Sequence, residues 1–197
     1  MSKQLKINKM KNLNYKTMRK LVFTLLMLLT LSLSAQVDFK GIPVDGDVPE
    51  MMNQLRKIGF KDTDQNYSIE GYTLPVLEGY FNGKQVHILI NAYNGKVYRI
   101  TVCDANTVSE AQIIINFNRL FDQFVENSKY TLEQGKKIND DEDVSYNMKI
   151  RNYVYEASFI QNMQNNSVWF RIVEVNSKYY IGIMYDNLLN APNGDDL

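Results

Sequence analysis

Two Asn-Gly pairs, Asn82-Gly83 and Asn94-Gly95, constrain the fold of this chain more than any other feature. Each pair stands between runs rich in Val, Ile, Tyr and Phe, residues that favour β-strands. Asn-Gly suits the two positive-φ positions of a type I′ turn, whose twist matches that of paired strands. The pattern therefore predicts three consecutive antiparallel strands, at about 72–81, 84–92 and 96–103.

Residues 1–35 have the composition of a secretory signal peptide. They contain seven basic residues and no acidic one, and the apolar run Leu21–Leu33 leads to the small residues Ser34 and Ala35. This run is shorter than the ~20 residues that a membrane-spanning helix needs. We predict export to the periplasm or the medium with cleavage near Ala35, and Met18 is an alternative start. The competing interpretation is a retained N-terminal anchor.

Removal of the signal peptide leaves an acidic domain. The whole chain has 22 basic and 22 acidic residues, and seven of the basic ones precede the cleavage point, which leaves a net charge of −7. An acidic chain without a basic run is a poor partner for nucleic acid or anionic membranes, and no span remains to cross a membrane. Cys103 is the single cysteine, so stability must come from the core and not from an intrachain disulfide.

The first part of the mature chain predicts an extended segment followed by a helix. Val37–Asp47 is punctuated by glycine and proline and reads as extended. Asp47 and Glu50 form a D-x-x-E capping box, which predicts a helix at about 48–58. Gly59 supplies the left-handed residue that ends it.

The second part predicts the same order of elements. Thr107 and Glu110 form a T-x-x-E box before a longer helix that extends to about Asn127. Its expected apolar stripe is Ala111, Ile114, Phe117, Phe121, Phe124 and Val125. The strands expected after it lie at about 130–137, 148–160, 167–175 and 178–186.

A gapless shift of 82 residues aligns 85–104 with 167–186. Six positions are identical: Val86/Val168, Ile90/Ile172, Asn94/Asn176, Lys96/Lys178, Tyr98/Tyr180 and Asp104/Asp186. We therefore predict an α+β fold of two tandem repeats, 36–106 and 107–190, each a helix followed by an antiparallel meander, with the helices on one side of a curved sheet. A disordered tail would follow at 191–197. The alternative is two unrelated hairpins of similar composition.

Two resemblances accompany this layout. A helix with a sharp glycine stop, a meander, and then the same again resembles the tandem repeat of β-lactamase-inhibitor-protein-like (BLIP-like) domains. The opening Phe39–Phe60, FKGIPVDGDVPEMMNQLRKIGF, is similar to small exported proteins of unknown function from Gram-negative anaerobes. Both resemblances imply only a fold. The inhibitor is disulfide-bonded and this chain has one cysteine, so the resemblance implies neither β-lactamase inhibition nor any functional residue.

The sequence contains no motif for nucleophilic catalysis. His87 is the only histidine, and a Cys–His pair would require Cys103 beside it. Asp104 favours the protonated thiol, and no helix begins at Cys103 to lower its pKa. We therefore expect a surface histidine, a strand-end cysteine and no enzymatic activity.

Two acidic segments invite comparison with calcium sites. Asp62–Glu70 places oxygen ligands at alternate positions, but Tyr67 and Thr73 stand where an EF-hand needs its glycine and its bidentate carboxylate. Asp140–Asp143 is an acidic run with no flanking helix or strand in the pattern. We expect two polar loops with no metal or cofactor, and weak calcium binding is left open.

Aromatic residues in the last two strands give the one candidate site. If Val168, Phe170 and Ile172 face the helices, the alternate residues of that strand face outward. The alignment with a shift of 82 residues adds the odd-numbered residues of the final strand, including Ile183, and turns Tyr180, Gly182 and Met184 inward. The predicted binding residues are Trp169, Arg171, Val173, Tyr179, Ile181 and Tyr185. Whether this face is open or covered is undecided by alternation alone.

These observations favour a non-enzymatic binding or interaction protein that uses the outer face of its sheet. Its partner would be a protein or a glycan in the envelope or outside the cell. The alternatives are a carboxylate-dependent hydrolase such as a glycosidase, with two carboxyl groups about 5–10 Å apart in a pocket, and a purely structural envelope protein.

Overall fold

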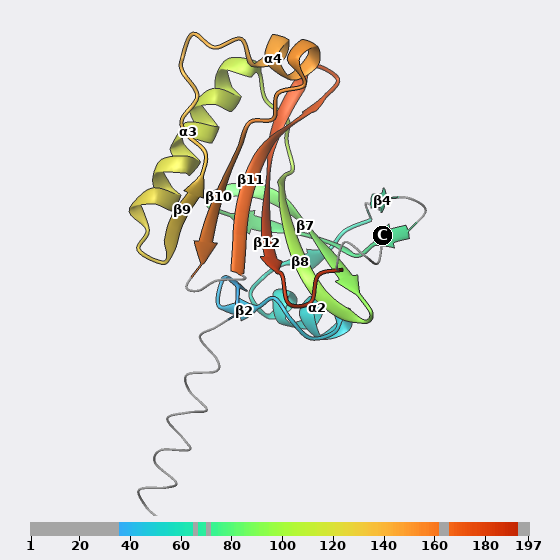
Figure 1. Cartoon of the computed structure of the whole chain (residues 1–197). Coiled ribbons are helices and arrows are strands. Elements are labelled where there is room, and N and C mark those ends of the chain that lie inside the picture. Colours follow the sequence, from blue (N-terminus) through green and yellow to red (C-terminus); the bar gives the residue numbers. More distant parts are fainter. Residues whose placement is uncertain (1–35, 65–66, 70–71, 162–165, 193–197) are drawn as a thin grey trace, which may run out of the picture. The chain divides into compact units, whose positions relative to one another are not determined.

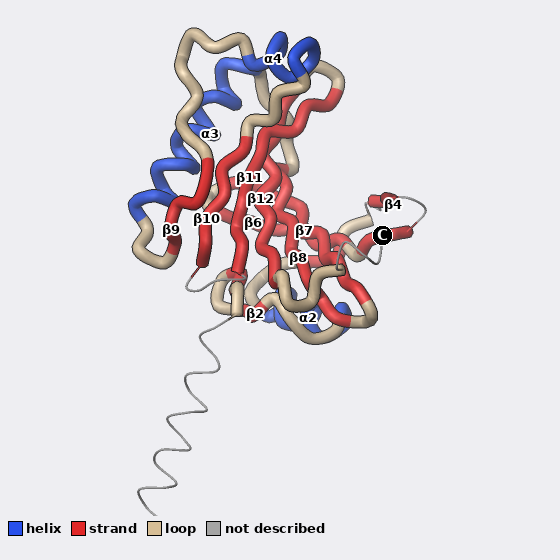
Figure 2. The backbone as a smooth tube through the Cα atoms, in the orientation of Figure 1, coloured by secondary structure: helices blue, strands red, loops and turns tan. Residues whose placement is uncertain are grey.

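A computed structural model describes residues 36–64, 67–69, 72–161 and 166–192 of the chain. These residues form an α+β fold around an eight-stranded antiparallel sheet of order β3-β6-β7-β8-β12-β11-β10-β9 (Figures 1 and 2). In that order the strands are Lys61–Asp62, Val76–Phe81, Lys84–Tyr93, Lys96–Asp104, Lys178–Asn187, Asn166–Val175, Glu156–Gln161 and Tyr130–Gln134.

The predicted first meander is present, with one difference. The two residues of each Asn-Gly turn have φ between 48° and 78°, as a type I′ turn requires. The predicted strand 72–81 is divided at Pro75, which has no N–H to donate to a ladder. Its first part, β5 (Tyr72–Leu74), pairs with β4 (Tyr67–Ile69) in a separate two-stranded sheet.

Helix α2 (Val48–Lys57) confirms the first predicted helix. Asp47 caps it, because a carboxylate oxygen of Asp47 accepts a hydrogen bond from the Glu50 N–H at 2.8 Å. Gly59, at φ 101°, and Phe60 both donate their N–H groups back to the last turn, which is the Schellman arrangement. The chain therefore leaves the helix with Phe60 buried.

Helix α3 (Glu110–Glu126) begins later than the Thr107 box predicts. Ser109 caps it instead, with its hydroxyl accepting an N–H of the first turn at 3.4 Å. The preceding residue, Val108, forms a β-bridge with Tyr179, with N–H···O distances of 2.8 and 3.0 Å. Because this bridge holds Val108 extended, the helix can start only after it.

The buried stripe of α3 also differs from the prediction. Ala111 and Val125, in the first and last turns, are exposed and not buried. The stripe is instead centred on positions three and four residues apart, the spacing of one helical face. Its members are Ile113, Ile114, Asn116, Phe117, Leu120, Phe121 and Phe124.

Helix α4 (Val144–Arg151) replaces the first part of the predicted strand 148–160, which is wrong there. Asp143 caps the helix, and Asn152, at φ 52°, ends it. Only Val144 of the helix is buried, so α4 has no apolar stripe that would reveal it in the sequence. The alternating pattern around it belongs to β10, which begins after the helix.

The remaining strands follow the prediction with small changes in length. The prediction 130–137 is confirmed over the five residues of β9. The predictions 167–175 and 178–186 are confirmed as β11 and β12, each with one further residue at the end away from their shared turn.

The opening segment is a small hairpin and not a simple extended stretch. β1 (Asp38–Phe39) pairs with β2 (Ile42–Pro43) across a turn at Lys40-Gly41 with φ values of 53° and 81°. The side chain of the buried Gln161 accepts from the Asp38 N–H at 2.6 Å and donates to the Asp38 carbonyl at 2.9 Å. These two bonds fix the hairpin at the end of β10.

The hydrophobic core lies between the sheet and the helices. α2 packs against β7 and β8, while α3 packs against β9, β11 and β12 and runs along the sheet in Figure 1. Buried residues of both helices belong to one cluster with alternate residues of the strands. We call this covered side the inner face and the opposite side the outer face.

The described residues from Gln36 onward form one compact unit. The predicted repeats, 36–106 and 107–190, share one sheet because β8 pairs with β12. The predicted signal peptide, 1–35, and residues 193–197 of the predicted tail lie outside the described residues. Among the described helices, none is long and apolar enough to cross a membrane.

Candidate functional site

Strand β11 presents its alternate residues to the two faces as predicted. The exposed Arg171 and the half-buried Trp169 and Val173 lie on the outer face. The residues between them point into the core. These buried residues are Val168, Phe170 and Ile172.

The predicted orientation of β12 is wrong. Tyr179, Ile181 and Tyr185 are at most 3 % exposed, and they lie on the inner face together with the buried Ile183. Directly paired residues of neighbouring strands share a face. Because Phe170 pairs with Ile183, the odd-numbered residues of β12 belong to the core and cannot contact a partner. The outer face of β12 carries Tyr180, Gly182 and Met184.

A β-bulge explains this error for Ile181, Ile183 and Tyr185. In the β7–β8 hairpin, Ala92 pairs with Val97 but Asn91 pairs with Arg99, so Tyr98 is an extra residue in β8. The β11–β12 hairpin has no such extra residue, and Val173 pairs directly with Tyr180, the aligned counterpart of Tyr98. A shift of one residue exchanges the two faces of a strand. Beyond the bulge, the gapless alignment therefore assigns every residue to the wrong side.

The outer face is covered in one part and open in another. His87, Leu89 and Met184 are on this face and buried, over β7 and β12. Arg171 is exposed on β11, and its direct partner on β10, Glu156, is exposed as well. The part of the outer face around β11 is therefore open, and we call Trp169, Arg171 and Val173 the open patch.

A charged network lies beside the open patch. The Arg99 guanidinium donates from Nε to Asp186 Oδ1 at 2.6 Å and from Nη2 to Asp186 Oδ2 at 2.8 Å. The Trp169 indole N–H donates to the same Oδ2 at 2.9 Å. Burial by itself would lower the pKa of Arg99, but these bonds and the charge of Asp186 raise the pKa above its usual value. The network fixes the orientation of the indole.

Two guanidinium groups lie over the Trp169 ring. The Arg99 and Arg171 guanidinium carbons are 5.5 and 5.7 Å from its centre, within the range of cation–π attraction. Asp186 neutralises Arg99, whereas Arg171 forms no ion pair with any described residue. Arg171 is therefore an exposed cation whose five N–H donors are available to an anionic partner.

The histidine and the cysteine are neighbours, as the Cys–His hypothesis requires, but their chemistry is unfavourable. His87 pairs directly with Cys103 across β7 and β8, and it is buried, so the expected surface histidine is wrong. Burial and the nearby Asp104 raise the pKa of Cys103 to about 11, although Arg171 lowers it. The thiol is thus protonated near neutral pH, the form that does not attack as a nucleophile.

The acidic run 140–143 has structural roles that the sequence did not reveal. Asp143 caps α4. Glu142 accepts hydrogen bonds from the Tyr155 hydroxyl at 2.7 Å and from Asn147 Nδ2 at 3.3 Å. Among the described residues, no group of three His, Cys, Asp or Glu could hold a metal ion. Part of the other acidic segment, Asp62–Glu70, lies outside the described residues.

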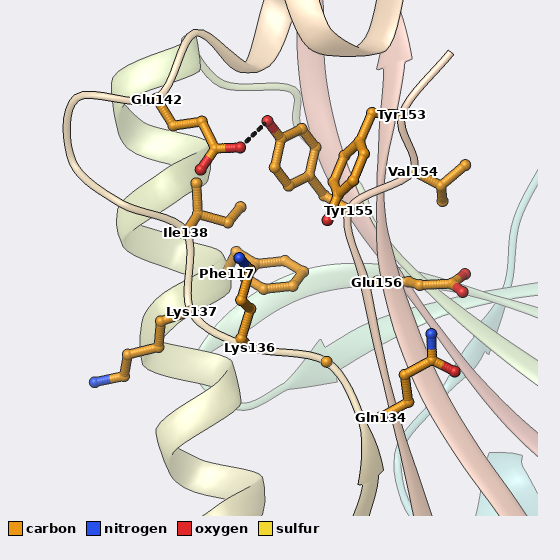
Figure 3. A pocket seen from close by; sticks show the side chains of 11 residues that line it. Phe117, Gln134, Lys136, Lys137, Ile138, Glu142, Tyr153, Val154, Tyr155 and Glu156 are labelled. Carbon is orange, nitrogen blue, oxygen red and sulfur yellow. Dashed lines mark hydrogen bonds between the residues drawn. The ribbon is translucent and has the colours of Figure 1, made fainter. Parts of the chain in front are cut away.

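Two carboxylates, Glu142 and Glu156, line one cavity of about 360 Å³ (Figure 3). Glu142 turns toward Tyr155, whereas Glu156 extends away from it in this view. A glycosidase needs both carboxyl groups directed at one bond of the substrate. This pair does not favour the hydrolase alternative, which stays a prediction.

Sequence reasoning did not identify Arg99 and Asp186. The position of Asp186 could have been predicted, because the two-residue turn Asn176-Ser177 fixes the register of β11 and β12. Counting from that turn places Asp186 on the same face as Trp169. The position of Arg99 could not have been predicted, because it depends on the bulge and on the pairing of β8 with β12.

Comparison of the chain with models of protein families, with curated proteins and with solved structures finds no match in any of the three.

Proposed function

We propose that this chain is an exported, non-enzymatic binding protein that captures an acidic segment of another protein through the open patch. The observation that carries the proposal is the exposed Arg171, stacked on Trp169 and without a carboxylate partner among the described residues. Tryptophan and arginine are the residue types enriched in interface hot spots. An arginine fork binds a carboxylate through two parallel hydrogen bonds.

The fixed orientation of Trp169 adds to this support. Its N–H is bonded to Asp186, which in turn is held by two bonds from Arg99. A side chain that is already ordered loses little rotamer entropy when a partner docks on it. The Trp169 ring is therefore a pre-organised surface, and Arg171 beside it supplies the charge.

Export is part of the same proposal. The basic and apolar pattern of residues 1–35 supports it, and the compact unit begins at Gln36, directly after the expected cleavage point. The tandem duplication and the BLIP-like resemblance also belong to the proposal. They concern the origin of the fold and not the identity of the partner.

The test begins with the full chain produced in a Gram-negative host. N-terminal sequencing of the exported protein is expected to start at Gln36, and retention of residues 1–35 would contradict export.

The purified protein then serves as bait for envelope and medium proteins. Each captured protein is purified and its Kd is measured against wild type, Arg171→Glu and Arg119→Glu. Arg119 is a matched control because it is an exposed arginine on α3, away from the open patch.

We expect Arg171→Glu to weaken binding at least tenfold, which corresponds to about 1.4 kcal/mol, and Arg119→Glu to leave it unchanged. The affinity should also fall as salt concentration rises, because the contact pairs exposed charges. Equal binding by both variants would remove the open patch from the interface. A neutral glycan as the partner would contradict the acidic-segment proposal.

A further inference from the structure

A cavity between α3 and the segment that joins β9 to β10 is the second feature with the chemistry of a ligand site (Figure 3). Its volume of about 360 Å³ falls within the ~300–1,000 Å³ of small-molecule sites. Phe117 from α3 and Ile138 from the joining segment give it an apolar side, and Tyr153 and Tyr155 stand opposite. It does not include any residue of the open patch.

The joining segment is held in place on both sides of the cavity. Asn118 of α3 binds Ile138 twice, donating to its carbonyl and accepting from its N–H, each at 2.8 Å. Gly135 passes so close to β10 that an added Cβ would lie 2.7 Å from the Ala157 Cα. These contacts form the cavity walls without a ligand, so binding would cost little reorganisation.

One end of the cavity is a polar cluster in which one hydrogen-bond acceptor has no donor among the described residues. Tyr155 is 4 % exposed, and its hydroxyl donates to Glu142 Oε1 at 2.7 Å and accepts from Asn147 Nδ2 at 2.8 Å. Burial, together with Glu142, raises the pKa of Tyr155 to about 12 despite the Asn147 bond, so it remains a neutral donor. All hydrogen bonds that the Glu142 carboxylate accepts from the described residues go to Oε1. The second carboxylate oxygen, Oε2, is therefore available to accept a proton donor.

Lys136 supplies a positive charge at the other end of the cavity, from which the carboxylate of Glu156 extends away (Figure 3). Lys136 extends beside Phe117 toward the interior, while Lys137 points away from it (Figure 3). Lys137 is paired with Asp122 at 2.7 Å. Lys136 forms no hydrogen bond or ion pair with any described residue. One cavity thus holds an available cation and an available carboxylate oxygen, separated by an aromatic wall.

We propose that this cavity binds a small zwitterion of amino-acid size, with its carboxylate on Lys136, its ammonium on Glu142 and its side chain against Phe117. A ligand with one charge could satisfy only one end and would leave the other end unpaired. The size of the cavity and its aromatic wall favour a large apolar side chain over a polar one. The site is separate from the open patch, so it does not depend on the proposed function.

The test compares three probes that share one phenyl group: L-phenylalanine, 3-phenylpropanoate and 2-phenylethylamine. Binding of each to the protein is followed by NMR titration up to about 10 mM, which detects millimolar Kd values. We expect L-phenylalanine to bind at least tenfold more tightly than the two singly charged probes. Equal affinities, or no binding of L-phenylalanine, would overturn the proposal.

Variants then locate the site. Lys136→Met is expected to reduce L-phenylalanine affinity at least tenfold, and Lys136→Arg to retain it within a few fold because the charge is kept. Lys137→Met is the matched control, since it removes a neighbouring cation that points away from the cavity. Both positions are exposed, and circular dichroism would verify that the three variants fold. Unchanged affinity in Lys136→Met would place the ligand elsewhere and overturn the assignment.

Discussion

The hairpins β7–β8 and β11–β12 have closely similar sequences and turns but different registers. Both close with a two-residue turn whose residues have positive φ: Asn94-Gly95 in the first and Asn176-Ser177 in the second. The Ser177 N–H donates to Glu174 at 2.9 Å, a bond that supports a non-glycine residue in this conformation. From the turn outward the hairpins match for two residue pairs, and they diverge at Tyr98.

The extra residue changes which side chains meet across the sheet. Ile100 and Val102 beyond the bulge are buried, whereas their aligned counterparts, Gly182 and Met184, are on the outer face. Arg99 lies on the outer face, while its aligned counterpart, Ile181, is in the core. The bulge therefore brings Arg99 beside Asp186 and Trp169. A regular copy of the second hairpin would place an apolar residue there.

This difference shows that matching sequences establish similar strands without establishing the same faces. Tyr98 and Tyr180 are identical residues in identical local sequence positions, yet one is in a bulge and the other in the ladder. The turn, which fixes the register of the first pairs, is the safer guide to orientation.

Deletion of Tyr180 and deletion of Tyr98 should differ greatly in their effect on stability. Deletion of Tyr180 moves Ile181, Ile183 and Tyr185 from the core to the outer face. Each side chain loses about 1.5–3 kcal/mol of burial, a sum comparable with the ~5–15 kcal/mol stability of a typical domain. We expect this variant to show no cooperative transition in urea when followed by circular dichroism.

Deletion of Tyr98 is the matched control. It removes only the extra residue and leaves the pairs Ala92–Val97 and Asn91–Arg99 as neighbours in a regular ladder. We expect this variant to unfold cooperatively, with a loss of about 1 kcal/mol for the contacts of one half-buried side chain. Loss of folding in this variant and a folded Tyr180 deletion would together reverse the assignment of the bulge.

The elements that local chemistry determines were predictable from the sequence. The Asn-Gly turns and the Asp47 cap of α2 act through neighbouring residues, so their residue types suffice. Within β11 the alternation of faces was also predictable, because the pattern repeats every two residues. The shared face of Trp169, Arg171 and Val173 therefore follows from the sequence, whereas the exposure of that face does not.

The rest depends on contacts between distant residues. The start of α3 is set by the bridge of Val108 to Tyr179, and the Arg99–Asp186 pair joins residues 87 positions apart. Helix α4 has caps but only one buried residue, so the alternation near it was a stronger signal than its own. None of these features produces a periodic pattern of apolar residues from which it could be predicted.

Asp104 and Asp186 are identical aligned residues whose substitution by asparagine should differ in cost. Asp186 is buried and holds Arg99 and Trp169. Removing one partner of a buried ion pair costs about 3–5 kcal/mol, and we expect about 2–3 kcal/mol because Arg99 is partly exposed. Asp104 holds Lys84 at 3.0 Å in a more exposed pair, for which about 0–1 kcal/mol is expected.

Urea denaturation of both variants measures this difference. The Asp186→Asn loss should change little in high salt, because its pair is partly shielded from solvent, whereas any loss in Asp104→Asn should shrink. Equal losses in the two variants would mean that Asp186 contributes only a surface ion pair. The open patch would then lack the ordered support that its binding role requires.

The reactivity of Cys103 also tests the comparison between the two hairpins. The gapless alignment equates it with the inward Tyr185, whereas the bulge places it on the outer face opposite Gly182. Burial and Asp104 raise its pKa from 9.0 to about 11. A thiol on the outer face should therefore react with iodoacetamide, but at pH 8 about a hundredfold more slowly than in urea, because only the thiolate reacts.

The pH dependence separates this explanation from simple shielding. A raised pKa in the folded state stabilises the protein below pH 9, and this contribution is lost as the pH rises from about 9 to 11. The native alkylation rate should therefore rise about tenfold per pH unit up to about pH 11, while the rate in urea levels off near pH 9. A native rate that stays flat over this range would mean that the reagent cannot reach Cys103. Cys103 would then lie either under the covered part of the outer face, with His87 and Met184, or on the inner face, like its aligned counterpart Tyr185.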